Sequence, residues 1–222
     1  MMGMDAPTGR TSNTAAIKLE FSDGRPALTE VDDINRQLRL IGSGVWPIDF
    51  RDIPPEIRDL LHRTQLTSEE RETLKQHFLL SREQLLQIIT NAGREPHVPG
   101  GGEMSTYVVS HDYWYPQLHL VQDGIDYSRF DRFHVNIADD GTGTDEVGQL
   151  LAGGVIVIHL RLPNEEVFTV SIRCESEDLG WLVTYTGDKP HIGSLTQATP
   201  GTKLLVQVIG TPRWSINYVD GK

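Results

Sequence analysis

The sequence predicts an α+β protein, helical in its N-terminal part and built of antiparallel strands in its C-terminal part. Helical spacing of apolar residues and recognisable capping motifs extend as far as Gly93. From Ser105 onward, runs rich in Val, Ile, Thr and aromatic residues alternate with Gly, Pro and Asn turns, and no helical pattern separates them. About eight short strands at such regular spacing are typical of an antiparallel sandwich or barrel.

The N-terminal part begins with one short strand and continues with helices. Ile17 to Phe21 alternates apolar and polar residues, and a Ser-Asp-Gly turn follows it. Thr29, with Asp32 three residues later, and Ser81, with Gln84, each fit a capping box at the start of a helix. The run Thr67-Ser68-Glu69-Glu70 is a further helix start. The apolar residues of the expected helices recur at helical spacing: Val31, Ile34 and Leu38; Ile57, Leu60 and Leu61; Leu74 and Phe78; Leu85, Ile88 and Ile89.

Changes in composition divide the chain into three segments. Residues 1–16 are polar and small, so we expect a disordered tail. Residues 17–103 form a helical region, which we expect to pack on the β-barrel of residues 104–222 because each helix has only one apolar face. Residues 91–102 are rich in Pro and Gly but lack the Lys-Ser/Thr of a phosphate-binding loop, and this pattern predicts a hinge or turn.

The C-terminal segment contains the predicted strands. They are residues 106–109, 117–122, 130–137, 147–162, 166–174, 181–185, 204–209 and 215–218. The run Val155-Ile156-Val157-Ile158 is apolar on both faces, so we expect a central strand covered by the barrel interior and by a helix or a partner subunit. This run and the sheet edges together predict a homodimer.

Composition limits the partners. The chain of 222 residues carries a formal charge of −11, which argues against binding nucleic acid or an anionic membrane surface. No apolar run approaches the roughly 20 residues of a membrane span. Met1 to Ala16 lacks the apolar core of a signal peptide, and the single Cys174 cannot form an internal disulfide. We therefore expect a cytoplasmic protein whose partner is a small molecule.

One stretch contains the main candidate for chemistry. A β-like run contains His134, an acidic glycine-rich turn follows, and Glu146 opens a second apolar strand. Further along the chain, His191 follows a proline. Two neutral imidazoles and one carboxylate around open coordination positions suit Fe(II), Mn(II) or Ni(II). The alternative is that these three side chains are ordinary strand residues that hold no metal.

The two stretches resemble the two motifs of the cupin superfamily, in which an acidic ligand precedes a strand that ends at a glycine turn, and a proline-flanked histidine completes the site. The resemblance implies a double-stranded β-helix barrel that holds a divalent metal, Fe, Mn, Ni or Zn, through His134, Glu146 and His191. Two features depart from the cupin pattern. Asn136 stands where cupins usually have a second histidine, and residues 139–143 lengthen the gap between the first two ligands.

The resemblance implies a metal-dependent enzyme that acts on a small, oxygen-rich organic substrate, with dioxygenase, isomerase and lyase chemistry all open. Two other hypotheses fit the sequence. The same barrel can bind a small molecule or another subunit with neither catalysis nor metal. A metal-free isomerase or cyclase can instead use His and Asp side chains as acid and base.

Five further residues are candidates for a substrate pocket. His119 and His159 lie in strand-like runs and are candidate acid–base groups. Arg132, close to the first metal-ligand candidate, is a candidate clamp for a substrate carboxylate. Tyr113 and Tyr115 are candidates for lining the pocket around a flat or carbon-rich substrate. The structural alternatives are a surface ion pair for the arginine and core packing for the tyrosines.

Overall fold

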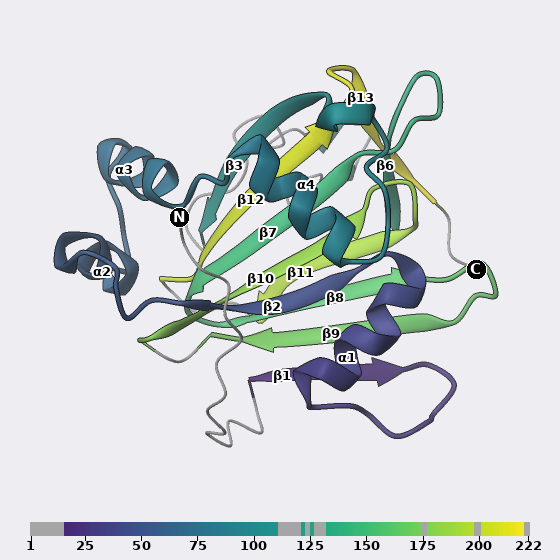
Figure 1. Ribbon diagram of the computed structural model, residues 1–222, viewed down its shortest axis with the longest axis horizontal. Helices are drawn as coiled ribbons and strands as arrows, with labels where there is room; N and C mark the ends of the chain where they lie inside the picture. Colours follow the sequence, from purple (N-terminus) through teal and green to yellow (C-terminus); the bar gives the residue numbers. More distant parts are fainter. Residues whose placement is uncertain are drawn as a thin grey trace.

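The computed structural model describes residues 16–110, 121–122, 125–126, 132–174, 177–197 and 201–219. Most of its strands form two antiparallel sheets that pack face to face, and helices flank one of them (Figure 1). The predicted α+β class with antiparallel sheets is therefore confirmed. None of the helices in the described ranges is long and apolar enough to cross a membrane.

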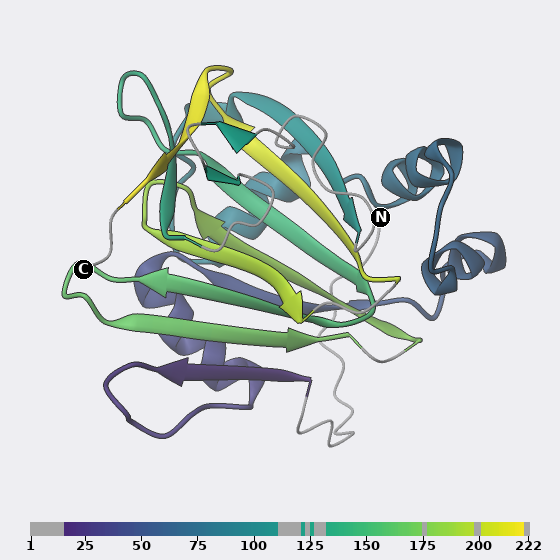
Figure 2. The same ribbon diagram turned by 180° about the vertical axis from the view of Figure 1, so that it is seen from behind.

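The six-stranded sheet faces the viewer in Figure 2. Its strands are, in order across the sheet, β1 (Ile17–Phe21), β9 (Val167–Arg173), β8 (Val155–Arg161), β11 (His191–Gln197), β6 (His134–Ala138) and β13 (Trp214–Tyr218). The expected central position of the apolar run is confirmed, because β8 lies between β9 and β11. The homodimer inferred from that run stays a prediction.

The five-stranded sheet forms the other layer. Its strands are, in order, β2 (Gly44–Asp49), β10 (Leu179–Thr186), β7 (Asp145–Ala152), β12 (Lys203–Gly210) and β3 (Glu103–Ser110). A separate ribbon consists of β4 (Val121–Gln122) and β5 (Ile125–Asp126).

The N-terminal part is not a helical region separate from the sheets, which corrects the prediction, although its first strand was expected at Ile17–Phe21. β1 pairs with β9 at the edge of one sheet, and β2 pairs with β10 at the edge of the other. The sequence pattern missed β2 because it contains Pro47, a residue that cannot donate to the ladder and is tolerated on an edge strand. Residues 17–49 thus supply one edge strand to each sheet.

The helices are α1 (Val31–Leu38), α2 (Pro55–His62), α3 (Ser68–Phe78) and α4 (Arg82–Asn91), with 3-10 turns at Arg39–Ile41 and Pro99–Gly101. The capping box predicted at Ser81 is present at the start of α4, and the helix start predicted at Thr67 has a capping box as well. The cap predicted at Thr29 is wrong, because the N-cap of α1 is Glu30 and its side chain makes no capping hydrogen bond. Figure 1 shows α4 lying across the five-stranded sheet. Its Leu85, Ile88 and Ile89 pack on the outer face of that sheet.

The apolar core fills the space between the two sheets at the end next to α1. Its largest contributions come from alternate residues of β1, β8, β9 and β10, which all turn toward the facing sheet. Ile34 and Leu38 of α1 complete this core and cover the gap between the edge strands β1 and β2. Burial of this face stabilises the sandwich and leaves the opposite end of the interior for polar side chains.

At that opposite end, backbone hydrogen bonds connect the two sheets. Asn136 N donates to Gly187 O at 2.7 Å, Gly187 N donates to Thr144 O at 2.6 Å, and Thr144 N donates back to Asn136 O at 3.1 Å. We call these three bonds the backbone ring. A Cβ on Gly187 would meet the Thr144 hydroxyl and, at 2.8 Å, Asn136 O, so only glycine fits. Within the described residues the sheets do not form one continuous barrel, which corrects the expectation of a closed one.

Candidate functional site

The strand register brings His134, Glu146 and His191 to one end of the interior. His134 on β6 and His191 on β11 are direct cross-strand partners, and their ring centroids lie 4.4 Å apart. Glu146 on β7 reaches them from the facing sheet, with its Oε1 3.7 Å from His191 Nε2. All three are buried, with exposed fractions of 3%, 6% and 1%. Residues far apart in the sequence thus form one buried cluster.

Each histidine is held in the same tautomer by a backbone carbonyl two residues earlier. His134 Nδ1 lies 3.0 Å from Arg132 O, and His191 Nδ1 lies 2.8 Å from Lys189 O. Because a carbonyl oxygen only accepts, Nδ1 carries the proton in both rings. Nε2 of each ring therefore keeps its lone pair, which is the arrangement that metal-ligating histidines use.

Burial keeps both imidazoles neutral. It lowers the pKa of His134 to about 4, and the neighbouring His191 ring adds to that effect. Burial alone is the main reason that the pKa of His191 also falls to about 4. At neutral pH both rings are in the form that binds metal ions or accepts a proton.

Neutral groups surround the Glu146 carboxylate. Burial raises its pKa, and hydrogen bonds from Asn136, Tyr185 and Thr144 oppose that rise. Tyr185 is its cross-strand partner on β10, and the tyrosine ring lies 4.9 Å from the His191 ring. We call His134, Asn136, Glu146, Tyr185 and His191 the inner polar cluster.

Asn136 lies at the centre of this cluster. Its Nδ2 donates to Glu146 Oε1 and lies 3.4 Å from His191 Nε2. Its Oδ1 is buried and has no hydrogen-bond partner among the described residues. A buried amide oxygen without a partner is unusual, because the lost hydration is not replaced.

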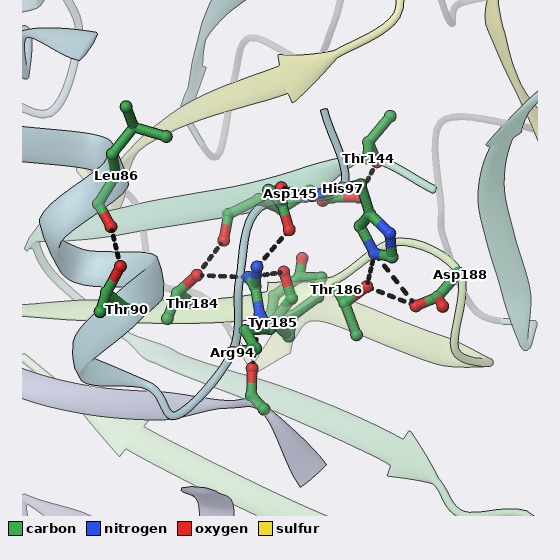
Figure 3. A network of polar contacts seen from close by, with 12 residues as sticks. Leu86, Thr90, Arg94, His97, Thr144, Asp145, Thr184, Tyr185, Thr186 and Asp188 are labelled. Atoms are coloured by element: carbon green, nitrogen blue, oxygen red, sulfur yellow. Dashed lines mark hydrogen bonds and ion pairs between the residues drawn. The ribbon is translucent and has the colours of Figure 1, made fainter. Parts of the chain in front are cut away.

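A second polar network lies on the outer face of the same strands (Figure 3). Arg94 pairs with Asp145, and it also donates to Thr184 Oγ1 at 3.1 Å and to Tyr185 O at 3.0 Å. His97 N donates to Asp145 Oδ2 at 2.9 Å. The His97 ring contacts Thr186 and lies 3.4 Å from Asp188 Oδ1. We call Arg94, His97, Asp145, Thr186 and Asp188 the outer network.

The other candidates from the sequence lie elsewhere. His159 faces away from the inner polar cluster, because its neighbour Leu160 is the residue opposite His191. Its Nδ1 contacts Thr169 Oγ1 at 3.0 Å. Arg132 is exposed, and its guanidinium stacks 4.9 Å from the Tyr218 ring. His119, Tyr113 and Tyr115 lie outside the described residues.

Among the described residues, no three His, Cys, Asp or Glu side chains are already arranged as a metal-binding group. The 3.7 Å distance from His191 Nε2 to Glu146 Oε1 is only slightly longer than the distance between two ligand atoms bound to one ion. Bonds of roughly 2.1 Å at tetrahedral angles place two such atoms about 3.4 Å apart. The amide nitrogen of Asn136, which contacts both atoms, lies in this part of the cluster.

Comparison with known proteins extends the description of the fold. A solved acireductone dioxygenase from Bacillus anthracis, a cupin-fold enzyme with a cadmium ion in its active centre, superposes with a TM-score of 0.59. The fold is cupin-like. The match covers 90% of this chain and 97% of that one, at 13% sequence identity. No family model and no curated protein matches the sequence.

Two members of the inner polar cluster were not predicted as site residues. Asn136 stood out only as a departure from the cupin motif, although it lies two residues from His134 and so on the same strand face. Tyr185 joins the cluster through its register opposite Glu146. That register depends on strand pairing between distant segments, which no local pattern reveals.

Proposed function

We propose that the protein is a cupin-like, metal-dependent enzyme that acts on a small organic substrate. The observation that carries this proposal is the inner polar cluster, in which His134, Glu146 and His191 lie together and buried at one end of the sandwich. The similar fold of an acireductone dioxygenase with cadmium in its active centre supports the same class of protein. The choice among dioxygenase, isomerase and lyase chemistry stays open.

The side chains fit a divalent metal in kind. His134 Nε2, His191 Nε2 and a Glu146 oxygen would be its ligands, and the unpartnered Asn136 Oδ1 is a further oxygen donor inside the cluster. Such a mixed nitrogen and oxygen set suits Fe(II), Mn(II), Ni(II) or Zn(II). When bound, the ion would supply a Lewis acid that polarises a substrate oxygen.

The chain's own groups would position the substrate and move protons around the reacting atoms. Tyr185 donates a hydrogen bond to Glu146 and so holds a proton at the edge of the cluster. The carbonyls of Arg132 and Lys189 fix both imidazoles in the orientation that ligation needs. Arg132, exposed near this end of β6, remains our proposal for a clamp on a substrate carboxylate.

Metal analysis of protein purified without an affinity tag tests the proposal. We expect about one divalent ion per chain, and its loss in a His191→Ala variant that keeps the wild-type circular dichroism spectrum. Lys189→Ala is the matched control, because its backbone carbonyl still accepts from the His191 ring. No stoichiometric metal in the wild type, or full retention in His191→Ala, would sink the proposal.

One observation favours a second candidate, a metal-free isomerase or cyclase. Glu146, with its raised pKa, lies beside His191, so a carboxyl group and a neutral imidazole are within reach of one small ligand. The two candidates differ in their response to chelators. Turnover that survives complete metal removal supports acid–base chemistry, and turnover that returns only with added metal supports the first candidate.

A further inference from the structure

Asn136 lies between Glu146 and His191 in the inner polar cluster. It is 5% exposed and extends from β6 on the same face as His134. An amide presents two hydrogen-bond donors on nitrogen and an acceptor oxygen, and these two ends suit opposite partners. Here the nitrogen end contacts Glu146 Oε1 and His191 Nε2, two atoms that both accept.

The amide orientation follows from its neighbours. With its oxygen turned to Glu146, Asn136 would bring two acceptors together in a buried place, which costs free energy. The nitrogen end is therefore favoured as long as the carboxylate has no cation beside it. The oxygen end then has no partner, as is observed for Oδ1.

A cation shared by Glu146 and His191 would contact the two atoms that Asn136 Nδ2 contacts now. An N–H group repels a cation and a carbonyl oxygen attracts it. Turning the amide about its last side-chain torsion exchanges its two ends without moving the backbone. A single rotation would therefore turn the unpartnered Oδ1 toward the cation and move Nδ2 away from it.

We propose, on the basis of the proposed metal-dependent function, that Asn136 is the residue that determines metal selectivity. It turns its Oδ1 toward the bound ion and so adds an oxygen donor where cupins usually have an imidazole. Amide oxygens favour harder ions such as Mn²⁺, whereas imidazole favours Zn²⁺ and Ni²⁺. The preference of the site thereby shifts toward Mn²⁺, compared with a site that has three histidines.

The test measures the affinities of Mn²⁺ and Zn²⁺ separately, by equilibrium competition with a chromogenic chelator. The quantity compared is the ratio of the two dissociation constants. Breaking the amide contact with Glu146 costs the same for either ion, so this cost cancels in the ratio. We expect Asn136→His to raise the preference for Zn²⁺ by about tenfold or more. Asn136→Leu should raise the preference for Zn²⁺ by a smaller factor, and Asn136→Asp should lower that preference.

Thr144→Val is the matched control. Its hydroxyl lies 3.5 Å from Glu146 Oε1 and 3.4 Å from the main-chain Asn136 O, so the variant removes a neighbour of the carboxylate and keeps the Asn136 side chain. Its ratio should equal that of the wild type. A ratio within about twofold of the wild type in both Asn136→His and Asn136→Leu overturns the selectivity role. If either variant fails to fold, the direction of change in Asn136→Asp decides.

Titration of the wild type separates this inference from the proposed function. A wild-type protein that binds neither Mn²⁺ nor Zn²⁺ stoichiometrically overturns both. A wild-type protein that binds them through His191, with a ratio insensitive to residue 136, overturns the selectivity role alone. A crystal structure with Mn²⁺ should place Asn136 Oδ1 on the side of the ion.

Discussion

Asp145 and Glu146 are neighbours in one strand, yet their carboxylates lie in opposite kinds of surroundings. Asp145 points outward, where the Arg94 guanidinium and the His97 N–H bind it. Glu146 points inward, where neutral groups from Asn136, Tyr185 and Thr144 surround it. Both are buried, at 1% and 6% exposed. The outer network supplies a guanidinium as the countercharge of Asp145, whereas the hydrogen bonds that Glu146 receives from Asn136, Tyr185 and Thr144 come from neutral groups.

The largest expected effect is the loss of the outer countercharge. Arg94→Met leaves Asp145 buried without its ion-pair partner, which should lower the free energy of unfolding by about 3–5 kcal/mol. Denaturant unfolding monitored by circular dichroism measures this. Replacing Asp145 by Leu in the same chain should restore most of the loss, because no unpaired charge then remains. If the free energy of unfolding of Arg94→Met alone lies within about 1 kcal/mol of the wild type, Arg94 is not the countercharge that Asp145 requires.

The inner histidines should give a pH dependence of stability. The pKa of both His134 and His191 falls to about 4 in the folded protein, from an ordinary value of 6.5. Between these values the unfolded chain binds more protons, so stability rises with pH. The gain is on the order of 3 kcal/mol for each ring, and less where the two titrate together. Unfolding curves between about pH 4 and 8 in chelator measure it.

His97 in the outer network should show the opposite sign. The Asp188 carboxylate raises the pKa of the His97 imidazole. The stability that His97 contributes is fully present below its pKa in the unfolded chain. It is lost as the pH rises through its pKa in the folded protein. His134→Gln with His191→Gln should remove the acid-side slope, and His97→Gln should leave that slope in place. An acid-side slope that persists in the double variant would show that other groups cause it.

Amide substitution of the two neighbouring carboxylates sharpens the comparison. Asp145→Asn leaves the buried Arg94 charge without its partner and should destabilise by about 3 kcal/mol or more. Glu146→Gln removes a buried charge that has only neutral neighbours, so stability should change by less than about 1 kcal/mol or increase. Equal losses in the two variants would mean that Glu146 has a structural countercharge after all.

The smallest expected effect belongs to Asp188. Hydrogen bonding to His97 lowers its pKa from 3.8 to about 2. The stability that Asp188 contributes is present above its pKa in the unfolded chain, and it is lost as the pH falls from about 4 to about 2. Because the Asp188 side chain is 40% exposed, we expect its ion pair to contribute less than about 1 kcal/mol to stability. The wild type and Asp188→Asn should therefore differ at about pH 5 and converge near pH 2.

The sequence predicted the strands and helices with strong local patterns. The capping boxes at Thr67 and Ser81 are satisfied by residues three positions away, so their chemistry is visible in a short window. In β8, His159 and its neighbour Leu160 face opposite ways, as alternation along any strand requires. Alternation alone cannot say which face is inside, and His159 proved to lie on the outer one.

The candidate site was predictable only in part. The resemblance to cupin motifs selected His134, Glu146 and His191, and the structure brings these three together. The outer network had no such signal, because Arg94 belongs to a segment without periodicity, and its contacts depend on where that segment crosses β7 and β10. The edge strand β2 was hidden for a similar reason, since its proline is acceptable only at an edge.

The backbone ring fixes the positions of His134 and Glu146 independently of the number of residues in the turn between them. Asn136 and Thr144 are joined on the site side of the hairpin formed by residues 139–143, so that hairpin can lengthen or shorten without moving His134 or Glu146. The unusual spacing of the first motif is then an insertion at a tolerant position. Related proteins can be sought by allowing a variable gap here while holding the glycine at position 187 fixed.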